Sequence, residues 1–242
     1  MMMIERLRDA LLCCALVFAA MAAPHATAEE AADEPVEFSE AETRMWMTDQ
    51  LKAVDTPMTL RYSFTRSGSL EPGFEDEVRF VIDAINEDGT KGASVQFFTG
   101  ERQFPVPPVS STDVNPILKV YLQGDVYEMN RLTDPEGSAR ERWRYFQRRV
   151  KLALAESATV TPHTFEFSDR EWQGHEIRFA PYVNDPKRDL FERFADKTYR
   201  VIVSDELPGY VYRVETVIPS AGEAEEPLIR EVMQLEAIER AN

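Results

Sequence analysis

Residues 60–65 read Leu-Arg-Tyr-Ser-Phe-Thr, so that large apolar side chains alternate with polar ones. A period of two places the apolar side chains on one face of a β-strand and the polar ones on the other. The same alternation recurs at 78–83 and 93–97, and turn sequences at 71–73 (Glu-Pro-Gly) and 86–89 (Asn-Glu-Asp-Gly) separate the three segments. Strands joined by such short turns pair antiparallel, so this part of the chain predicts an antiparallel sheet with one face in water.

Beyond these strands the period changes to that of helices and then returns to two. Asn115-Pro116 is a typical helix start, because proline is tolerated in the first turn, and a second helix is predicted from about Ser138 to Glu156. Before the strands, residues 40–54 are predicted as a helix that Ser39 and Glu42 begin with a capping box. Alternation then predicts five more strands, at 159–167, 175–182, 197–204, 210–218 and 228–238, with a short helix at 185–195.

This order of elements predicts the α+β class, with a single curved antiparallel sheet of about eight strands packed against two to three helices. An unclosed barrel is one form that such a sheet can take. Residues 103–116 are rich in proline and are predicted to be irregular. The predicted domain organisation is a signal peptide at 1–28, a disordered acidic leader at 29–39 and a single α+β domain at 40–242.

The N-terminal segment has the three parts of a cleavable signal peptide. Arg6 and Arg8 precede an unbroken apolar run at 11–23, and residues 26–28 (Ala-Thr-Ala) are small where a signal peptidase cuts. The run is shorter than the roughly 20 residues that a membrane span needs, and no later segment approaches that length, so no transmembrane anchor is predicted. Cleavage near Ala28 predicts a periplasmic protein and removes both cysteines, which excludes disulfides, thiolate catalysis and cysteine zinc sites.

Charge and motifs narrow the function further. The formal net charge of −16 argues against a general binder of nucleic acids or anionic membranes, because like charges repel. The sequence holds no phosphate-binding or dinucleotide fingerprint and no serine nucleophile elbow, so no cofactor is predicted and no catalytic residue is assigned.

Two histidines remain after the signal segment. His163 and His175 lie on the two arms of a predicted hairpin, and Glu166, Asp169 and Glu176 are close to them in the sequence. Two histidines hold a metal only together with further ligands, so two partly exposed strand histidines are the preferred interpretation and no metal site is predicted.

One basic segment differs from the rest of this acidic chain. Six arginine and lysine residues between 140 and 151 are opposed there by a single acidic residue, Glu141. Four of them share one stripe of the predicted helix: Arg140, Arg144, Arg148 and Lys151. The stripe is either a contact site for an anion or an acidic partner, or a solvated helix face that the protein's own carboxylates neutralise, and the second interpretation is preferred.

The predicted strands also carry many aromatic side chains. An aromatic sheet face is either a filled core, which is the default, or the lining of a pocket for an acyl chain or another apolar ligand. The candidate ligand contacts in the second case are Tyr62, Phe64, Phe80, Phe97 and, from the second middle helix, Trp143.

The second half of the chain resembles a group of uncharacterised secreted proteobacterial proteins. The segments that carry the resemblance are Asn-Pro-Ile-Leu (115–118), Asp-Val-Tyr-Glu-Met (125–129), Arg-Leu-Thr (131–133), Tyr-Phe-Gln-Arg-Arg-Val (145–150), Pro-Tyr-Val-Asn-Asp-Pro (181–186), Lys-Thr-Tyr (197–199) and Leu-Pro-Gly-Tyr-Val-Tyr (207–212). The resemblance implies no activity and no residue roles. The order of elements is similar to that of the periplasmic lipoprotein carriers and receptors, in which helices cover the apolar cavity of an unclosed antiparallel barrel; this similarity is architectural and involves no shared motif.

Three functional hypotheses follow. The first is an exported, periplasmic, non-enzymatic protein that binds or carries an apolar ligand, such as a lipid, in a cavity between sheet and helices. The second is an interaction or assembly factor of an envelope complex that uses the arginine-rich helix. The third is a hydrolase with an unrecognised acidic or histidine site. The oligomeric state stays open in all three.

Overall fold

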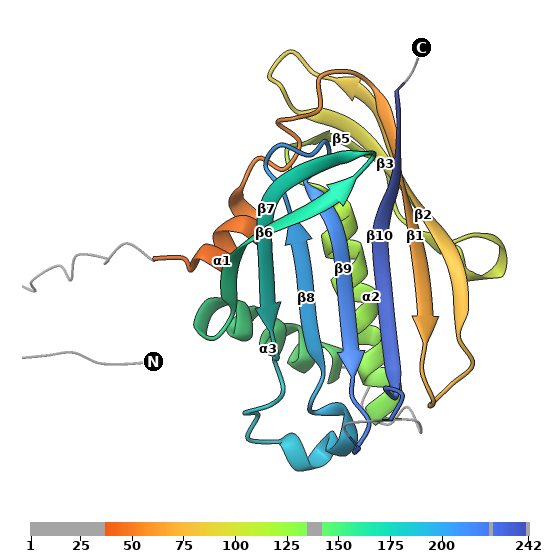
Figure 1. Cartoon of the computed structure of the whole chain (residues 1–242), viewed down its shortest axis with the longest axis vertical. Helices are drawn as coiled ribbons and strands as arrows, with labels where there is room; N and C mark the ends of the chain where they lie inside the picture. The colour runs from red at the N-terminus through yellow and green to blue at the C-terminus, as the bar shows by residue number, and fades with distance from the viewer. Residues whose placement is uncertain (1–36, 135–141, 223–224, 241–242) are drawn as a thin grey trace, which may run out of the picture. The chain divides into compact units, whose positions relative to one another are not determined.

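The computed structural model describes residues 37–134, 142–222 and 225–240. Within them, strands form one antiparallel sheet in the order β4-β3-β2-β1-β10-β9-β8-β7-β6, with β5 paired to β3. The strands are β1 Met58–Ser67, β2 Phe74–Ile85, β3 Lys91–Phe97, β4 Phe104–Pro105, β5 Val109–Thr112, β6 Thr159–Phe167, β7 Arg170–Phe179, β8 Thr198–Val203, β9 Val211–Ile218 and β10 Ile229–Arg240. The sheet is curved and open, because the strands at its two ends do not pair with each other (Figure 1).

Three α-helices accompany the sheet. They are α1 Glu40–Glu42, which continues into the π-helical turn η1 Thr43–Met47, then α2 Pro116–Thr133 and α3 Arg142–Glu156; the 3-10 turns are η2 Gly100–Arg102, η3 Arg188–Leu190 and η4 Glu192–Phe194. The predicted α+β class, with one open antiparallel sheet and two to three helices, is confirmed. Among the described residues, no helix has the length and hydropathy that crossing a membrane requires.

The first helix is shorter than predicted. Its capping box is present, since the Ser39 hydroxyl accepts from the Glu42 N–H and the Glu42 carboxylate accepts from the Ser39 N–H, each at 3.0 Å. The helical turns end at Met47 because Thr48 is extended, with ψ of 139°. The N–H groups of Gln50 and Leu51 donate to the carbonyl of Asp113, a distant partner that sequence periodicity could not foresee.

Three other segments differ from the predicted elements. The proline-rich segment 103–116 contributes the short strands β4 and β5. Strand β7 begins earlier than predicted, because Ser168 and Asp169 both adopt positive φ and form a two-residue hairpin turn after β6. Residues 185–195 form two 3-10 turns, η3 and η4, instead of one helix, because Glu192 has a φ of 45°.

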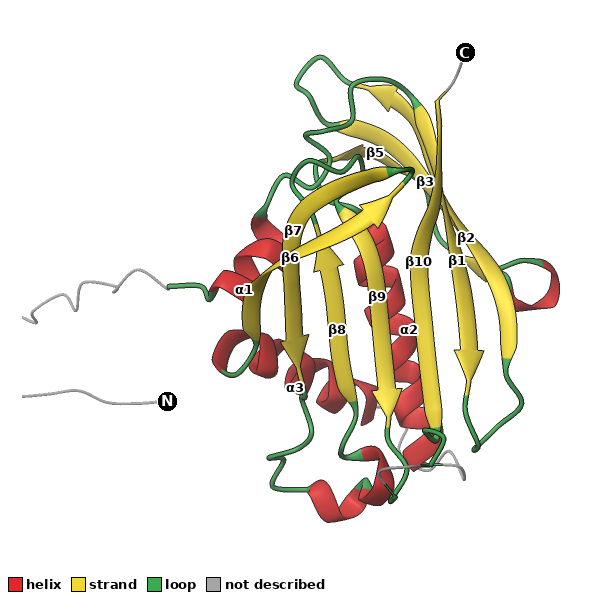
Figure 2. Ribbon diagram, in the orientation of Figure 1, coloured by secondary structure: helices red, strands yellow, loops and turns green. Residues whose placement is uncertain are grey.

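Helix α2 packs along one face of the sheet, behind β8, β9 and β10 in the ribbon view (Figure 2). The alternation at residues 60–65 turns Leu60, Tyr62 and Phe64 into this interface, and all three are buried. Ile117, Leu118 and Met129 of α2 belong to the same core. The opposite face of the sheet carries the polar residues of each alternation.

The N-terminal and C-terminal strands pair in the middle of the sheet. Strand β1 pairs with β10 from Met58 opposite Arg240 to Ser67 opposite Arg230, with a register shift at Arg61/Tyr62. The seam therefore joins residues far apart in the sequence, such as Arg61 and Glu239, which are 178 positions apart.

A buried ion pair lies between α2 and β8. The Asp125 carboxylate and the Lys197 ammonium form a salt bridge in which both side chains are only 1% exposed. The Tyr199 hydroxyl donates a hydrogen bond to the same carboxylate. The pair therefore helps to fix the register of α2 over the sheet.

A second cluster of charges holds the C-terminal half of α2. The carboxylate of Glu128 accepts hydrogen bonds from Arg66 of β1 at 2.6 Å and from Arg131 at 2.7 and 2.8 Å. Burial acts to raise the pKa of Glu128, but the hydrogen bonds from Arg131 and Arg66 outweigh it and lower the pKa from 4.5 to about 2.

Replacing Glu128 with glutamine is expected to lower the free energy of unfolding at pH 7 by about 2 kcal/mol, after allowance for the exposed Arg131. A lowered pKa in the folded state stabilises the protein above the unfolded pKa, and this contribution is lost as the pH falls through the folded pKa. The difference between wild type and Glu128→Gln should therefore shrink as the pH falls from 4.5 toward 2. Urea unfolding from pH 7 to pH 3 measures it, and a pH-independent difference would contradict the assignment.

Candidate ligand-binding groove

An apolar groove runs beside α2, on the side of the helix that faces β3 and the proline-rich segment. It consists of two adjoining hollows with volumes of about 440 and 510 Å³. The first lies between α2, η1 and the β3–β5 region, and the second lies between η1, α2 and α3. Four residues line both hollows: Trp46, Val114, Lys119 and Gln123. We call the two hollows together the α2 groove; each is of the size that small-molecule sites usually have.

Exposed apolar side chains concentrate at this groove. Nine large apolar side chains are exposed among the described residues, and five of them line the groove: Phe38, Trp46, Met47, Phe104 and Val109. A contiguous exposed apolar surface is unfavourable in water, so it marks a place where an apolar ligand or partner is covered from solvent.

The proline-rich segment forms one side of the groove, and the η1 turn that carries Trp46 forms the other. Pairing with β3 stops after Pro105, and Pro107 and Pro108 follow before β5 begins, so Val106 lies between the two short strands and lines the first hollow. On the other side, the Gln50 amide donates to the carbonyl of Met45 at 3.0 Å and accepts from the N–H of Asn115 at 2.9 Å. Gln50 thereby ties η1, which carries Trp46, to the start of α2.

Polar groups are few in the groove and point to one kind of ligand. The Gln123 side chain accepts a hydrogen bond from Gln147 at 3.2 Å, while its own Nε2 is buried without a hydrogen-bond partner. Buried amide donors are nearly always satisfied in proteins, so the unpartnered Nε2 of Gln123 is unusual. Lys119 lines both hollows and Lys151 lines the second, while the one carboxylate there, Glu42, is already bonded in the capping box.

The strand aromatics that sequence analysis singled out lie elsewhere. Tyr62, Phe64, Phe80 and Phe97 are buried in the core and none of them lines the groove. Tyr62 donates its hydroxyl to the carbonyl of Val211 at 3.0 Å. Their contact with a ligand stays a prediction, and their observed contacts are those of core residues.

The other predicted site residues lie on or near α3. Trp143 packs edge-on against Tyr127 of α2, with ring centroids 5.6 Å apart, and the Arg144 guanidinium lies 5.4 Å from its ring centre. Arg144, Arg148 and Lys151 are exposed, and of these Lys151 lines the groove. Arg140 lies outside the described residues.

The two histidines occupy opposite faces of the β6–β7 hairpin. His163 pairs with Gly174 and His175 with Pro162, so the histidines are offset by one position. The His163 Nδ1 atom is 3.9 Å from the Glu176 carboxylate on one face. On the other face the His175 ring lies 3.0 Å from the Arg44 guanidinium, and burial together with this charge lowers the pKa of His175. The described residues contain no cluster of three side chains suited to a metal ion.

Sequence reasoning missed the residues that form the groove. Trp46 lies within the segment 40–54 that is predicted as a helix, and Phe104, Val106 and Val109 lie in a segment that is predicted as irregular. One signal was available: large apolar residues within a proline-rich stretch cannot reach a regular core and therefore favour an exposed apolar surface.

Comparisons with known proteins leave the ligand unassigned. No family model and no curated protein matches the chain. Among solved structures, MucB in complex with MucA(peri) is similar with a TM-score of 0.36 and 9% identity, over 85% of this chain and 56% of that one. The MucA/MucB complex of Pseudomonas aeruginosa has a TM-score of 0.34 and 9% sequence identity, over 84% of this chain and 58% of that one.

A LolA superfamily protein from Nitrosomonas europaea gives a TM-score of 0.22 and 6% identity, over 84% of this chain and 94% of that one. This chain covers less than two thirds of the length of the matched chain in each of the two MucB-containing structures. Similarities this low assign neither a ligand nor a partner.

Proposed function

We propose that the protein is exported and binds an anionic amphiphile, such as a fatty acid or a lipid with a free acidic group, in the α2 groove without changing it chemically. The observation that carries the proposal is the concentration of exposed apolar side chains at one groove, five of the nine in the described residues. Burying these side chains against an acyl chain would gain about 25 cal/mol for each Å² of apolar surface removed from water.

The acidic group is suggested by the polar atoms of the groove. The unpartnered Nε2 of Gln123 can donate to a carboxylate or ester oxygen at the junction of the hollows. Lys119 and Lys151 would place two ammonium groups near the same oxygen. Hydrogen bonds to a charged acceptor are stronger than those between neutral groups, so an anion is preferred to an alcohol.

Export is supported by the sequence alone. The charged start, apolar run and small residues at 26–28 form a signal peptide pattern, and a periplasmic location follows from it. A carrier in an aqueous compartment needs a covered apolar site, and the groove offers one.

Native mass spectrometry of the protein, purified from the periplasm without detergent, tests this function. We expect an excess mass that organic solvent extracts as an acyl compound, and a bare chain mass after denaturation and refolding. Adding palmitate to the refolded protein should restore a one-to-one adduct. A bare mass both before and after palmitate would exclude the proposed function.

A second candidate function is binding to an envelope protein through α3. The exposed Arg144 and Arg148 on this helix support it, because exposed basic side chains can recognise an acidic partner. A bare mass in the experiment above would favour this function over ligand carriage.

A further inference from the structure

We propose that the outer face of the sheet, away from α2, holds a second site that binds a phosphomonoester group. The site is a shallow hollow of about 600 Å³ over β7 to β10. Four arginines from four adjacent strands line it: Arg178, Arg200, Arg213 and Arg230. We call it the arginine hollow. It shares no lining residue with the α2 groove.

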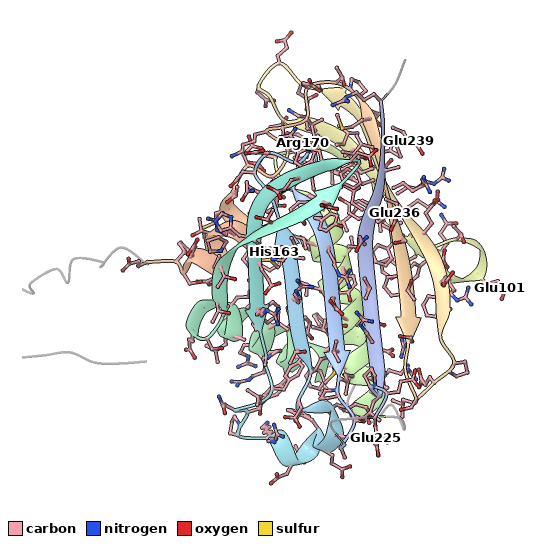
Figure 3. All side chains as sticks on the ribbon, viewed as in Figure 1. Glu101, His163, Arg170, Glu225, Glu236 and Glu239 are labelled. Atoms are coloured by element: carbon pink, nitrogen blue, oxygen red, sulfur yellow. The ribbon has the colours of Figure 1, made fainter. Side chains whose placement is uncertain are left out.

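Strand register brings the arginines together. Arg178 of β7 lies directly opposite Arg200 of β8, and Arg200 lies directly opposite Glu215 of β9. Arg213 precedes Glu215 by two positions and therefore shares its face. Figure 3 views this face of the sheet, with His163 of β6 labelled to one side and Glu236 of β10 to the other.

The hollow holds more positive than negative charge. Glu176 accepts hydrogen bonds from the Nε atoms of Arg178 and Arg200. Glu215 accepts from Arg230 at 2.8 Å and from Arg213 at 3.2 Å. Two carboxylates thus form ion pairs with four guanidinium groups, which leaves a local excess of two positive charges. The protein as a whole has a net charge of −16.

A comparison within the same sheet shows that this excess is local. Arg61 and Arg79 also lie directly opposite each other on the outer face, but Glu77 and Glu239 pair with them, one carboxylate for each arginine. Like charges opposite each other in a sheet are destabilising unless they are compensated. In the arginine hollow the compensation is partial, because Glu176 and Glu215 supply one carboxylate for every two arginines.

Hydrogen-bond donors are also left over in the hollow. The Nε of Arg213 is buried and has no hydrogen-bond partner. Arg178 bonds to Glu176 through its Nε atom, and its side chain is 61% exposed where it lines the hollow. Free donors on planar guanidinium groups match the oxygens of a phosphate.

A phosphomonoester has a charge that fits the arginine hollow. Such a group carries a charge of about −1.5 to −2 at pH 7, which matches the two uncompensated arginines. A single carboxylate would neutralise only half of the excess. The strongly negative remainder of the protein would repel a long polyanion, so one isolated phosphomonoester is favoured.

Isothermal titration calorimetry with inorganic phosphate, and sedimentation with phosphatidylcholine vesicles with or without phosphatidic acid, test the site. We expect Arg178→Gln/Arg230→Gln to weaken binding of whichever probe binds by about tenfold or more. Arg61→Gln/Arg79→Gln is the matched control and should bind within about twofold of wild type, and both variants should keep the wild-type melting temperature.

Binding of inorganic phosphate would identify a soluble phosphate compound as the ligand class, and binding only to vesicles that contain phosphatidic acid would identify a lipid headgroup. The proposal is overturned if neither probe binds, or if the two double variants bind equally. Lys119→Gln/Lys151→Gln should leave this binding unchanged, which separates the arginine hollow from the α2 groove.

Discussion

Replacing Lys197 with methionine is expected to lower the free energy of unfolding by about 3–5 kcal/mol, because it leaves the buried Asp125 carboxylate without its cation. Both side chains are only 1% exposed, so water cannot take the place of the ammonium group. The hydroxyl of Tyr199 would remain as a hydrogen-bond donor to Asp125, but one neutral donor does not offset a desolvated charge. Urea unfolding at pH 7, followed by circular dichroism, measures the loss.

The double variant Asp125→Asn/Lys197→Met is the matched control. It removes both charges and keeps an amide oxygen that can accept from Tyr199, so it should be more stable than Lys197→Met alone by about 2 kcal/mol or more. Equal stability of the single and double variants would show that the two charges do not interact as the geometry indicates.

Replacing Gln123 with tryptophan is expected to weaken binding of a fatty acid by about 100-fold, or about 2.7 kcal/mol. Gln123 lines both hollows, so an indole at this position closes the α2 groove where they meet. Displacement of 11-(dansylamino)undecanoic acid by palmitate measures the affinity. The variant must keep the wild-type melting temperature for the comparison to hold.

Gln123→Ala distinguishes the contribution of the Gln123 amide to binding from the contribution of the open volume of the groove. It removes the unpartnered Nε2 and opens the groove, so palmitate should bind about tenfold more weakly while the alcohol of the same length binds nearly as in wild type. Wild-type affinity of Gln123→Trp for palmitate would place the acyl chain outside the α2 groove.

Local sequence was enough to predict the long strands, apart from the start of β7, and the inner face of β1. Leu60, Tyr62 and Phe64 alternate with polar residues and all point into the core, as a period of two requires. The helix from Pro116 begins as predicted, with the Asn115 side chain accepting from the N–H of Ile117. These features depend on neighbours within a few positions, which a sequence displays directly.

The features that sequence analysis missed depend on distant partners. The helix predicted to run to Val54 stops at Met47, and the N–H groups of Gln50 and Leu51 donate to the carbonyl of Asp113 instead. Aromatic content left two interpretations open for Phe80 and Phe97, a filled core or a pocket, and both side chains are buried while Trp46 is exposed. The arginine hollow depends on strand register, which brings together side chains from four separate strands.

The seam between β1 and β10 has a consequence for folding kinetics. A chain that emerges N-terminus first presents the apolar face of β1 long before residues 229–240 are available to pair with it. Contacts between residues as far apart as Arg61 and Glu239 slow folding, because a long loop must close before they form. The central sheet therefore assembles late, and a chain secreted in the unfolded state would stay competent for translocation until its last strand arrives.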